Sequence, residues 1–138
     1  MLQMNPYLTF NGNCREAMHF YRGISGGELN LQTIGESPMA VKMPAPMQDF
    51  ILHSELSKGT LVMMASDMVA EPGLVKGNAV SLMLGCSSEA EIRSCYEKLS
   101  AGGRADHPLE NTFRGAIFGD LTDKYGNRWL LHFDKKAN

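Results

Sequence analysis

Two stretches of this sequence share one pattern of residue classes, and a constant offset of 75 in residue number relates them. The pattern starts with a polar capping residue and a glutamate three positions later, continues as an apolar stripe of helical period, and ends at glycine. The pairs at this offset are Asn13 and Ser88, Glu16 and Glu91, Ala17 and Ile92, Tyr21 and Tyr96, Ile24 and Leu99, and Gly27 and Gly102. Six matches at one offset predict two copies of one structural unit.

Each copy is expected to contain one amphipathic helix. The first helix is predicted to begin at Asn13 and to stop at residues 26–27, and the second to begin at Ser88 and to stop at residues 102–103. Both beginnings resemble a capping box, in which the first side chain accepts a hydrogen bond from a free amide and the glutamate reaches back. The apolar stripes are Ala17, Phe20, Tyr21 and Ile24 in the first helix and Ile92, Cys95, Tyr96 and Leu99 in the second.

Short apolar runs bounded by turn residues predict four strands around each helix. These runs are residues 6–10, 28–34, 49–56 and 60–65 in the first copy, and 79–84, 104–109, 115–121 and 127–133 in the second. Aligning Gly59 with Gly126, in the turns before the last strands, gives an offset of 67 for this part of the two copies. Each copy therefore has the order βαβββ, and we expect a single domain of two repeats, about residues 4–67 and 77–134, with a linker at about 68–76.

The composition excludes several classes of protein. Residues 1–69 carry four basic and six acidic groups and residues 70–138 carry nine of each, so no basic stripe is available for nucleic acid. The apolar runs are far shorter than the ~20 residues of a membrane span, and the N-terminus does not resemble a signal peptide. Three cysteines, Cys14, Cys86 and Cys95, have no CxxC spacing and no even pairing, which favours reduced thiols in a cytoplasmic protein.

The paired βαβββ arrangement resembles the glyoxalase/bleomycin-resistance/extradiol-dioxygenase superfamily, also called the vicinal-oxygen-chelate superfamily, and three strings within it resemble the PhnB-like group. The strings are Pro6-Tyr7-Leu8-Thr9-Phe10-Asn11-Gly12-Asn13-Cys14, then Gly26-Gly27-Glu28-Leu29 after Phe20-Tyr21, then Thr112-Phe113, Phe118-Gly119, Thr122-Asp123-Lys124-Tyr125-Gly126 and Trp129. The resemblance implies an α+β fold in which two βαβββ modules form a concave, barrel-like mixed sheet with helices outside. One departure is Arg114, where similar proteins usually have tryptophan.

Enzymes similar to these typically hold one divalent metal through His, Glu or Gln side chains on the first and last strands of the units. The resemblance and the two offsets place the four positions at Pro6, Met63, Ser81 and Leu130. Three of these residues have no hard donor and the fourth offers a single hydroxyl. A shift of one residue in the alignment supplies nothing better. We therefore expect neither a metal nor another cofactor.

Strand alternation predicts which histidines face the cleft that the resemblance implies. His53 and Glu55 share one face of their strand, while the opposite face is apolar and suited to packing on a helix. His132 shares its face with Leu130 and is expected to point inward as well. These histidines are hydrogen-bonded wall residues, or His53 with Glu55 acts as a general base. A third interpretation is a non-standard metal site made of His53, Glu55 and His132.

The same alternation predicts an apolar wall made of Leu8, Phe10, Leu61, Met63, Met83 and Leu130. Such a wall is typical of a small-molecule pocket and also of an ordinary core. Our candidate ligand-binding residues are Phe10, His53, Met63, Ser81, Met83, Phe113, Arg114, Leu130 and His132. Segment 36–48 contains methionines at helical spacing but also Pro44 and Pro46, which predicts a loop that is either a lid or a dimer contact.

Two functions are compatible with these features. The first is a homodimeric protein that binds a small organic molecule without a metal, as the resemblance to bleomycin-resistance proteins implies. The alternative is a lyase- or isomerase-type enzyme that uses His53 and Glu55 or a non-standard metal site; a purely structural module also stays open. PhnB-like proteins are often labelled demethylubiquinone methyltransferases, but the chain has no G-x-G-x-x-G string and too few helices for a doubly wound sheet.

Overall fold

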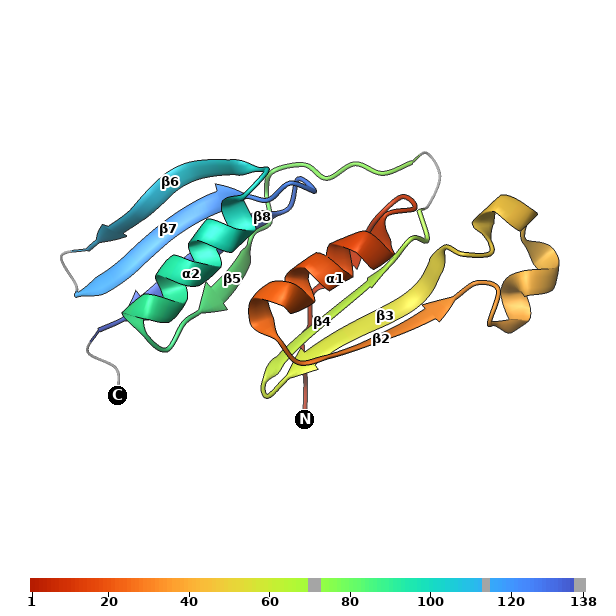
Figure 1. Ribbon diagram of the computed structural model, residues 1–138, viewed down its shortest axis with the longest axis horizontal. Coiled ribbons are helices and arrows are strands. Elements are labelled where there is room, and N and C mark those ends of the chain that lie inside the picture. The colour runs from red at the N-terminus through yellow and green to blue at the C-terminus, as the bar shows by residue number, and fades with distance from the viewer. Residues whose placement is uncertain (70–72, 113–114, 136–138) are drawn as a thin grey trace. The chain divides into compact units, whose positions relative to one another are not determined.

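The computed structural model describes residues 1–69, 73–112 and 115–135, and it divides into two compact units, Met1–Val75 and Lys76–Asn138 (Figure 1). The elements of unit 1 are β1 (Tyr7–Thr9), α1 (Cys14–Ser25), β2 (Glu28–Thr33), β3 (Ile51–Lys58) and β4 (Leu61–Ser66). Those of unit 2 are β5 (Leu82–Gly85), α2 (Glu89–Ser100), β6 (Arg104–Asn111), β7 (Ala116–Thr122) and β8 (Arg128–Asp134). The predicted α+β fold of two βαβββ modules is confirmed, and both ends of the helices keep the offset of 75.

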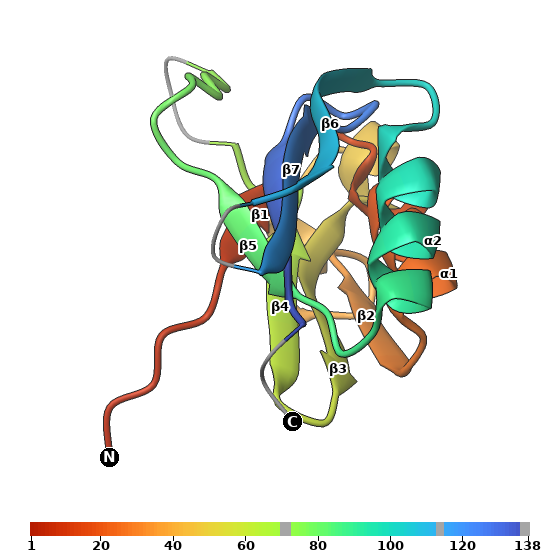
Figure 2. The same ribbon diagram turned by 90° about the vertical axis from the view of Figure 1, so that its left-hand side faces the viewer.

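Each unit has one mixed four-stranded sheet with one helix on one face. The strand orders are β1-β4-β3-β2 and β5-β8-β7-β6, and in each sheet only the first pair is parallel. Helix α1 packs on β2, β3 and β4, and α2 packs on β6, β7 and β8 (Figures 1 and 2). We call the face that the helix covers the helix face and the opposite one the open face. Successive side chains of a strand alternate between these two faces.

The core of each unit lies between the helix and the sheet. Its largest fully buried apolar side chains are Phe10, Met18, Ile34, Ile51 and Leu56 in unit 1, and Ile92, Leu99, Ile117, Leu121 and Leu131 in unit 2. The predicted stripe of the first helix missed Met18, which is fully buried, whereas Phe20 and Ile24 are only half-buried. The reason is that α1 sits on its sheet along Cys14, Ala17, Met18 and Tyr21.

The two helices begin in different ways. Ser88 caps α2 as predicted, because its Oγ accepts a hydrogen bond from the N–H of Glu91 at 3.0 Å. The predicted capping box of the first helix is wrong, because the side chain of Asn13 makes no capping hydrogen bond. The buried carboxylate of Asp67 takes that role: Oδ1 accepts from the N–H groups of Gly12 (2.8 Å) and Cys14 (3.0 Å). A residue just after β4 thereby satisfies the free N–H of Cys14, the first residue of α1.

The last two strands of the units are joined by loops of different length. Gly59 and Thr60 alone connect β3 to β4, between the paired residues Lys58 and Leu61. Residues 123–127 connect β7 to β8, and the buried Asp123 carboxylate accepts hydrogen bonds inside this loop. The glycines therefore hold different places in the two turns. Aligning Gly59 with Gly126 therefore misaligns β4 and β8 by one residue. The predicted offset of 67 is wrong for these two strands.

Burial gives the correct alignment of these strands. Met63 and Ala65 are the buried apolar residues of β4, and Trp129 and Leu131 are those of β8, which makes the offset 66. Because side chains alternate, a shift of one residue exchanges the two faces. The structural counterpart of Leu130 is therefore Met64 and not Met63.

Segment 36–48 is a folded connection that contains two short 3-10 helices, Pro38–Lys42 and Ala45–Met47. The amide of Gln48 donates to the carbonyl oxygens of Ala40 (2.9 Å) and Met43 (3.0 Å), so one side chain ties both turns together. The buried Ser37 hydroxyl accepts from the N–H of Met39 at 3.1 Å. Within the described ranges, no helix has the length and apolar character needed to cross a membrane.

Candidate functional site

The open face of unit 1 carries a row of side chains across four strands. Tyr7 of β1 pairs with Met64 of β4, Met64 pairs with Glu55 of β3, and Glu55 pairs with Asn30 of β2. In the next row, His53 pairs with Gln32. The sequence correctly placed His53 and Glu55 together on the face opposite the helix.

Tyr7 and His53 contact each other on this face. The Tyr7 hydroxyl lies 3.2 Å from His53 Nδ1, and the ring centroids are 5.8 Å apart. If Nδ1 carries the proton, it donates to the hydroxyl and leaves Nε2 as an acceptor; if the hydroxyl donates, Nε2 carries the proton. The contact orients the imidazole in either tautomer. Tyr7 was not among the site residues predicted from the sequence, although its alternation with the buried Phe10 places it on the open face.

The open face of unit 2 is more apolar. One row runs from Met83 of β5 through Leu130 of β8 and Asp120 of β7 to His107 of β6. The next row joins Gly85, His132, Phe118 and Glu110 in the same order. Met83 is 64% exposed and Phe118 is 37% exposed, so large apolar side chains lie uncovered beside His132 and Leu130 in this unit.

His107 and Asp120 form a pair that sequence reasoning did not identify. His107 Nδ1 lies 2.9 Å from one carboxylate oxygen of Asp120 and 3.0 Å from the other. The hydrogen bond that His107 Nδ1 donates to the Asp120 carboxylate, together with the charge of that carboxylate, raises the pKa of His107 above its usual value. Only the pairing of β6 with β7 brings these residues together, because they belong to different strands and no local pattern links them.

The candidate ligand-binding residues divide between the two faces. Met83, Leu130 and His132 lie on the open face of unit 2, and His53 lies on that of unit 1. Phe10 is 1% exposed and belongs to the core of unit 1. Ser81 is half-buried and directly precedes β5. Phe113 and Arg114 lie outside the described residues.

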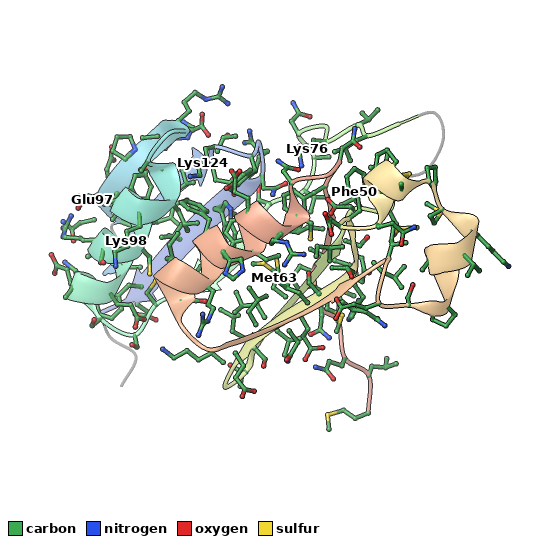
Figure 3. All side chains as sticks on the ribbon, turned by 45° about the vertical axis from the view of Figure 1, so that its right-hand side comes forward. Phe50, Met63, Lys76, Glu97, Lys98 and Lys124 are labelled. Carbon is green, nitrogen blue, oxygen red and sulfur yellow. The ribbon has the colours of Figure 1, made fainter. Side chains whose placement is uncertain are left out.

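Met63 differs from its predicted placement. It pairs with the buried Leu56 and is only 5% exposed, so it lies on the helix face of unit 1 (labelled in Figure 3). Its neighbour Met64, which pairs with Glu55, lies on the open face instead. Leu8 and Leu61 share the face of Met63 for the same reason, so the predicted apolar wall of unit 1 lies under α1.

The open-face side chains on the first and last strands do not fit a site for a divalent metal. Those that pair in one row are Tyr7 with Met64 in unit 1 and Met83 with Leu130 in unit 2, with one carboxylate beside each pair, Glu55 and Asp120; His132 lies in the next row of unit 2, where its partner on β5 is Gly85. A thioether or an aliphatic chain is not a ligand for a hard or borderline cation. In the part of the chain that the structure describes, no three or more His, Cys, Asp and Glu side chains gather as a group able to hold a metal ion.

The fold is similar to that of a glyoxalase/bleomycin-resistance protein. A glyoxalase/bleomycin resistance protein/dioxygenase from Nocardioides is similar in structure, with a TM-score of 0.56 over 100% of this chain and 87% of that one, at 15% sequence identity. At this identity the likeness concerns the fold alone.

Two further comparisons define the family. The model of the 3-demethylubiquinone-9 3-methyltransferase family matches residues 3–132, and the chain belongs to this PhnB-like family of the vicinal-oxygen-chelate superfamily. Protein PA1353 from Pseudomonas aeruginosa is 37% identical, with a TM-score of 0.86 over 97% of this chain and 98% of that chain. A putative 3-demethylubiquinone-9 3-methyltransferase, PhnB protein, from Bacillus cereus is 25% identical, with a TM-score of 0.76 over 96% and 99%.

Proposed function

We propose that this protein binds a small organic molecule on the open faces of its sheets without the metal that is typical of the superfamily. The observation that carries the proposal is the group of uncovered apolar side chains beside histidine in unit 2, where Met83 and Phe118 are 64% and 37% exposed in the rows of Leu130 and His132. Sites for small organic molecules combine apolar surface with a few polar groups in this way. Flexible methionine side chains adapt to ligands of irregular shape.

Three further residues, Ser81, Phe113 and Arg114, remain candidates for contacting the ligand. Ser81 supplies a hydroxyl next to β5, near the start of the Met83 row. Phe113 and Arg114 supply an aromatic ring and a cation, which suits a ligand that carries an acidic group. The absence of a metal is supported by Met64, Met83 and Leu130 on the first and last strands, whose thioether and aliphatic side chains offer no suitable donors.

Binding can be tested with 8-anilinonaphthalene-1-sulfonate, an aromatic organic anion. We expect saturable binding to the wild-type protein that Met83→Glu weakens at least tenfold, because a carboxylate on the open face repels the anion and removes apolar surface. Leu2→Glu is the matched control, since Leu2 is 99% exposed and precedes β1, outside the strands of either sheet. Equal binding by both variants would contradict the open-face site. A stoichiometric metal in protein purified without chelator would contradict metal-free binding.

An enzyme of the lyase or isomerase type is the second candidate function, supported by the Tyr7–His53 contact at 3.2 Å. In the tautomer with the proton on Nδ1, Nε2 of His53 is free to accept a proton from a substrate, and Glu55 lies on the same face. Incubating the protein with a small-molecule cell extract in heavy water tests this function. Deuterium incorporated at carbon by the wild type and not by His53→Gln supports a general base, and no incorporation by either refutes it.

The methyltransferase activity in the family's name is not part of the proposal. A sheet of the order β1-β4-β3-β2 with one helix is not the doubly wound sheet of a Rossmann-type methyltransferase, and the sequence has no glycine-rich cofactor turn. Titration calorimetry with S-adenosylmethionine tests this point, and binding at micromolar strength would show that the rejection is wrong.

The remaining parts of the proposal concern organisation and location. We propose a single domain of two repeats with a linker near residues 68–76. We also propose a homodimer in which segment 36–48 is either a lid or a dimer contact. The proposed location is the cytoplasm, where the three cysteines stay reduced. Analytical ultracentrifugation of the wild type and of Val41→Glu tests the dimer and the segment together. A monomeric wild type at micromolar concentration would refute the dimer.

A further inference from the structure

His107 and Asp120 form a histidine–carboxylate pair on the open face of unit 2, in the row that Leu130 and Met83 continue. The side chain of Asp120 is 18% exposed, whereas that of His107 is 80% exposed. Nδ1 of His107 faces the carboxylate, and Nε2 makes no hydrogen bond within the part of the chain that the structure describes. Solvent or a small molecule can therefore reach the imidazole, while its partner is held in the sheet.

The carboxylate fixes which ring nitrogen of His107 carries the proton. Its two oxygens lie 2.9 and 3.0 Å from Nδ1, and an ionised carboxylate can only accept hydrogen bonds. Neutral His107 therefore has its proton on Nδ1 and a lone pair on Nε2. The contact between Tyr7 and His53 in unit 1 does not select a tautomer in this way, because a hydroxyl can either donate or accept.

The backbone around His107 is irregular and is held from the helix face. In the pairing of β6 with β7, the register shifts between Arg104 and His107 and again between His107 and Glu110. Irregularities of this kind change the direction of a side chain. The hydroxyl of Tyr96, which is buried in α2, lies 2.9 Å from the carbonyl oxygens of both His107 and Asp120. One side chain thus ties the two strands together where the pair forms.

Apolar side chains lie beside the pair on the same face. Leu130 follows Asp120 in the row, and Phe118, which is 37% exposed, precedes Asp120 by two residues on β7. Neighbouring strands are about 4.8 Å apart, so Leu130 on β8 lies roughly 10 Å from His107 on β6 along the row. A flat bicyclic molecule spans that distance. Such a ligand can cover the apolar side chains and still reach Nε2.

We propose that His107 is a catalytic base, with Asp120 as its positioning residue, for a small apolar carbon acid bound beside Leu130 and Phe118. The inference rests on the proposed binding of a small organic molecule to the open face of unit 2, and it places the base in unit 2 rather than at His53. Nε2 takes a proton from a carbon of the ligand, and the electron pair of the C–H bond stays in the ligand. The Asp120 carboxylate stabilises the imidazolium that forms. The proton then returns to another carbon, which is an isomerisation, or a leaving group departs with its electron pair, which is an elimination.

The charges around His107 make its imidazole a stronger base. Asp120 raises the pKa of His107, first through the hydrogen bond and then through its charge, and the charges of Asp106 and Glu110 on β6 act in the same direction, whereas desolvation acts against them. Only the neutral imidazole accepts a proton. The rate is therefore expected to rise with pH through the folded-state pKa of His107.

The elimination of 5-nitrobenzisoxazole, a neutral bicyclic carbon acid, tests the pair. The base takes the proton from the ring carbon, the N–O bond breaks, a nitrile forms, and the molecule opens to a coloured cyanonitrophenolate that absorbance follows. We expect the wild type to react faster than free imidazole at equal concentration, with saturation in substrate, and His107→Gln to lose at least tenfold in kcat/KM. The exposed side chain of His107 makes this variant expected to fold normally. His19→Gln, at an exposed position of α1, is the matched control and should keep the wild-type rate.

Two further variants separate positioning from binding. In Asp120→Asn we expect the midpoint of the pH profile of kcat to move to lower pH and the plateau to fall, because the imidazole loses the carboxylate that raises its pKa. In Met83→Glu we expect KM to rise with no shift of this midpoint. An unchanged pH profile in Asp120→Asn would overturn its role as the positioning residue.

The remaining outcomes distinguish this proposal from the binding function on which it rests. A wild type no faster than imidazole, or a His107→Gln variant that keeps the wild-type rate, would overturn the catalytic pair. Loss of the reaction in His132→Gln but not in His107→Gln would assign the base to His132 and would overturn it as well. If 8-anilinonaphthalene-1-sulfonate still binds in these cases, only the catalytic pair fails; if it does not bind either, the proposed binding function fails too.

Discussion

Met63 and Met64 allow a direct test of which face of unit 1 is the core. They are neighbours in β4 and point to opposite faces, with Met63 paired to Leu56 under α1 and Met64 paired to Glu55 on the open face. Met63 is 5% exposed, whereas Met64 is half-buried. Substituting each with alanine removes the same atoms from the same strand, so the β-propensity change is the same in both variants.

The expected magnitudes differ because only one substitution leaves a cavity. A buried methionine changed to alanine costs about 2–5 kcal/mol, and the nearly complete burial of Met63 places it at about 3 kcal/mol. For Met64, which water already reaches in part, we expect less than about 1 kcal/mol. In a chain of this size the larger loss lowers the melting temperature by roughly 10 °C.

Chemical unfolding in guanidinium measures these losses. Far-UV circular dichroism follows both units, and the fluorescence of Trp129, the only tryptophan, follows unit 2. We expect Met63→Ala to shift the circular dichroism midpoint strongly and Met64→Ala to shift it little. If Met64→Ala costs as much as Met63→Ala, the assignment of the two faces is wrong, and so is the revised alignment of β4 with β8.

Three further predictions concern single residues. Asp67→Asn should cost about 2 kcal/mol in denaturant unfolding, because the carboxylate accepts three backbone N–H bonds and the amide keeps only one acceptor oxygen; a loss below about 0.5 kcal/mol would contradict its capping role. Gly27→Ala should cost on the order of 3 kcal/mol or prevent folding, since φ is 97° and the new Cβ would lie 2.3 Å from a backbone oxygen, whereas Gly23→Ala, with open space around it, should be neutral or stabilising. Asp120→Asn should lower the pKa of His107, measured by NMR titration, because Asp120 raises that pKa. The pair stabilises the fold below the unfolded-state pKa of histidine, and this stabilisation is lost as the pH rises through the folded-state pKa. An unchanged titration of His107 in the variant would refute the interaction.

Much of the fold could be predicted from the sequence, because its signals are local. The capping pattern at Ser88, the apolar periodicity of both helices and the glycines after them are set within a few residues, and they gave the order βαβββ twice. The placement of His53 and Glu55 on one face also followed from local alternation.

Features that depend on long-range pairing required the tertiary structure. The face on which Met63 lies could not be predicted because the loop before β4 has two residues and the loop before β8 has five. Aligning the glycines of these loops hides this difference in length. Asp67, after the last strand of unit 1, caps the helix that follows the first strand, and His107 meets Asp120 across two strands. The repeat visible in the sequence thus determined what each unit is made of. Strand pairing and burial decided which side chains meet, since a shift of strand register by one residue moves every side chain to the opposite face of the sheet.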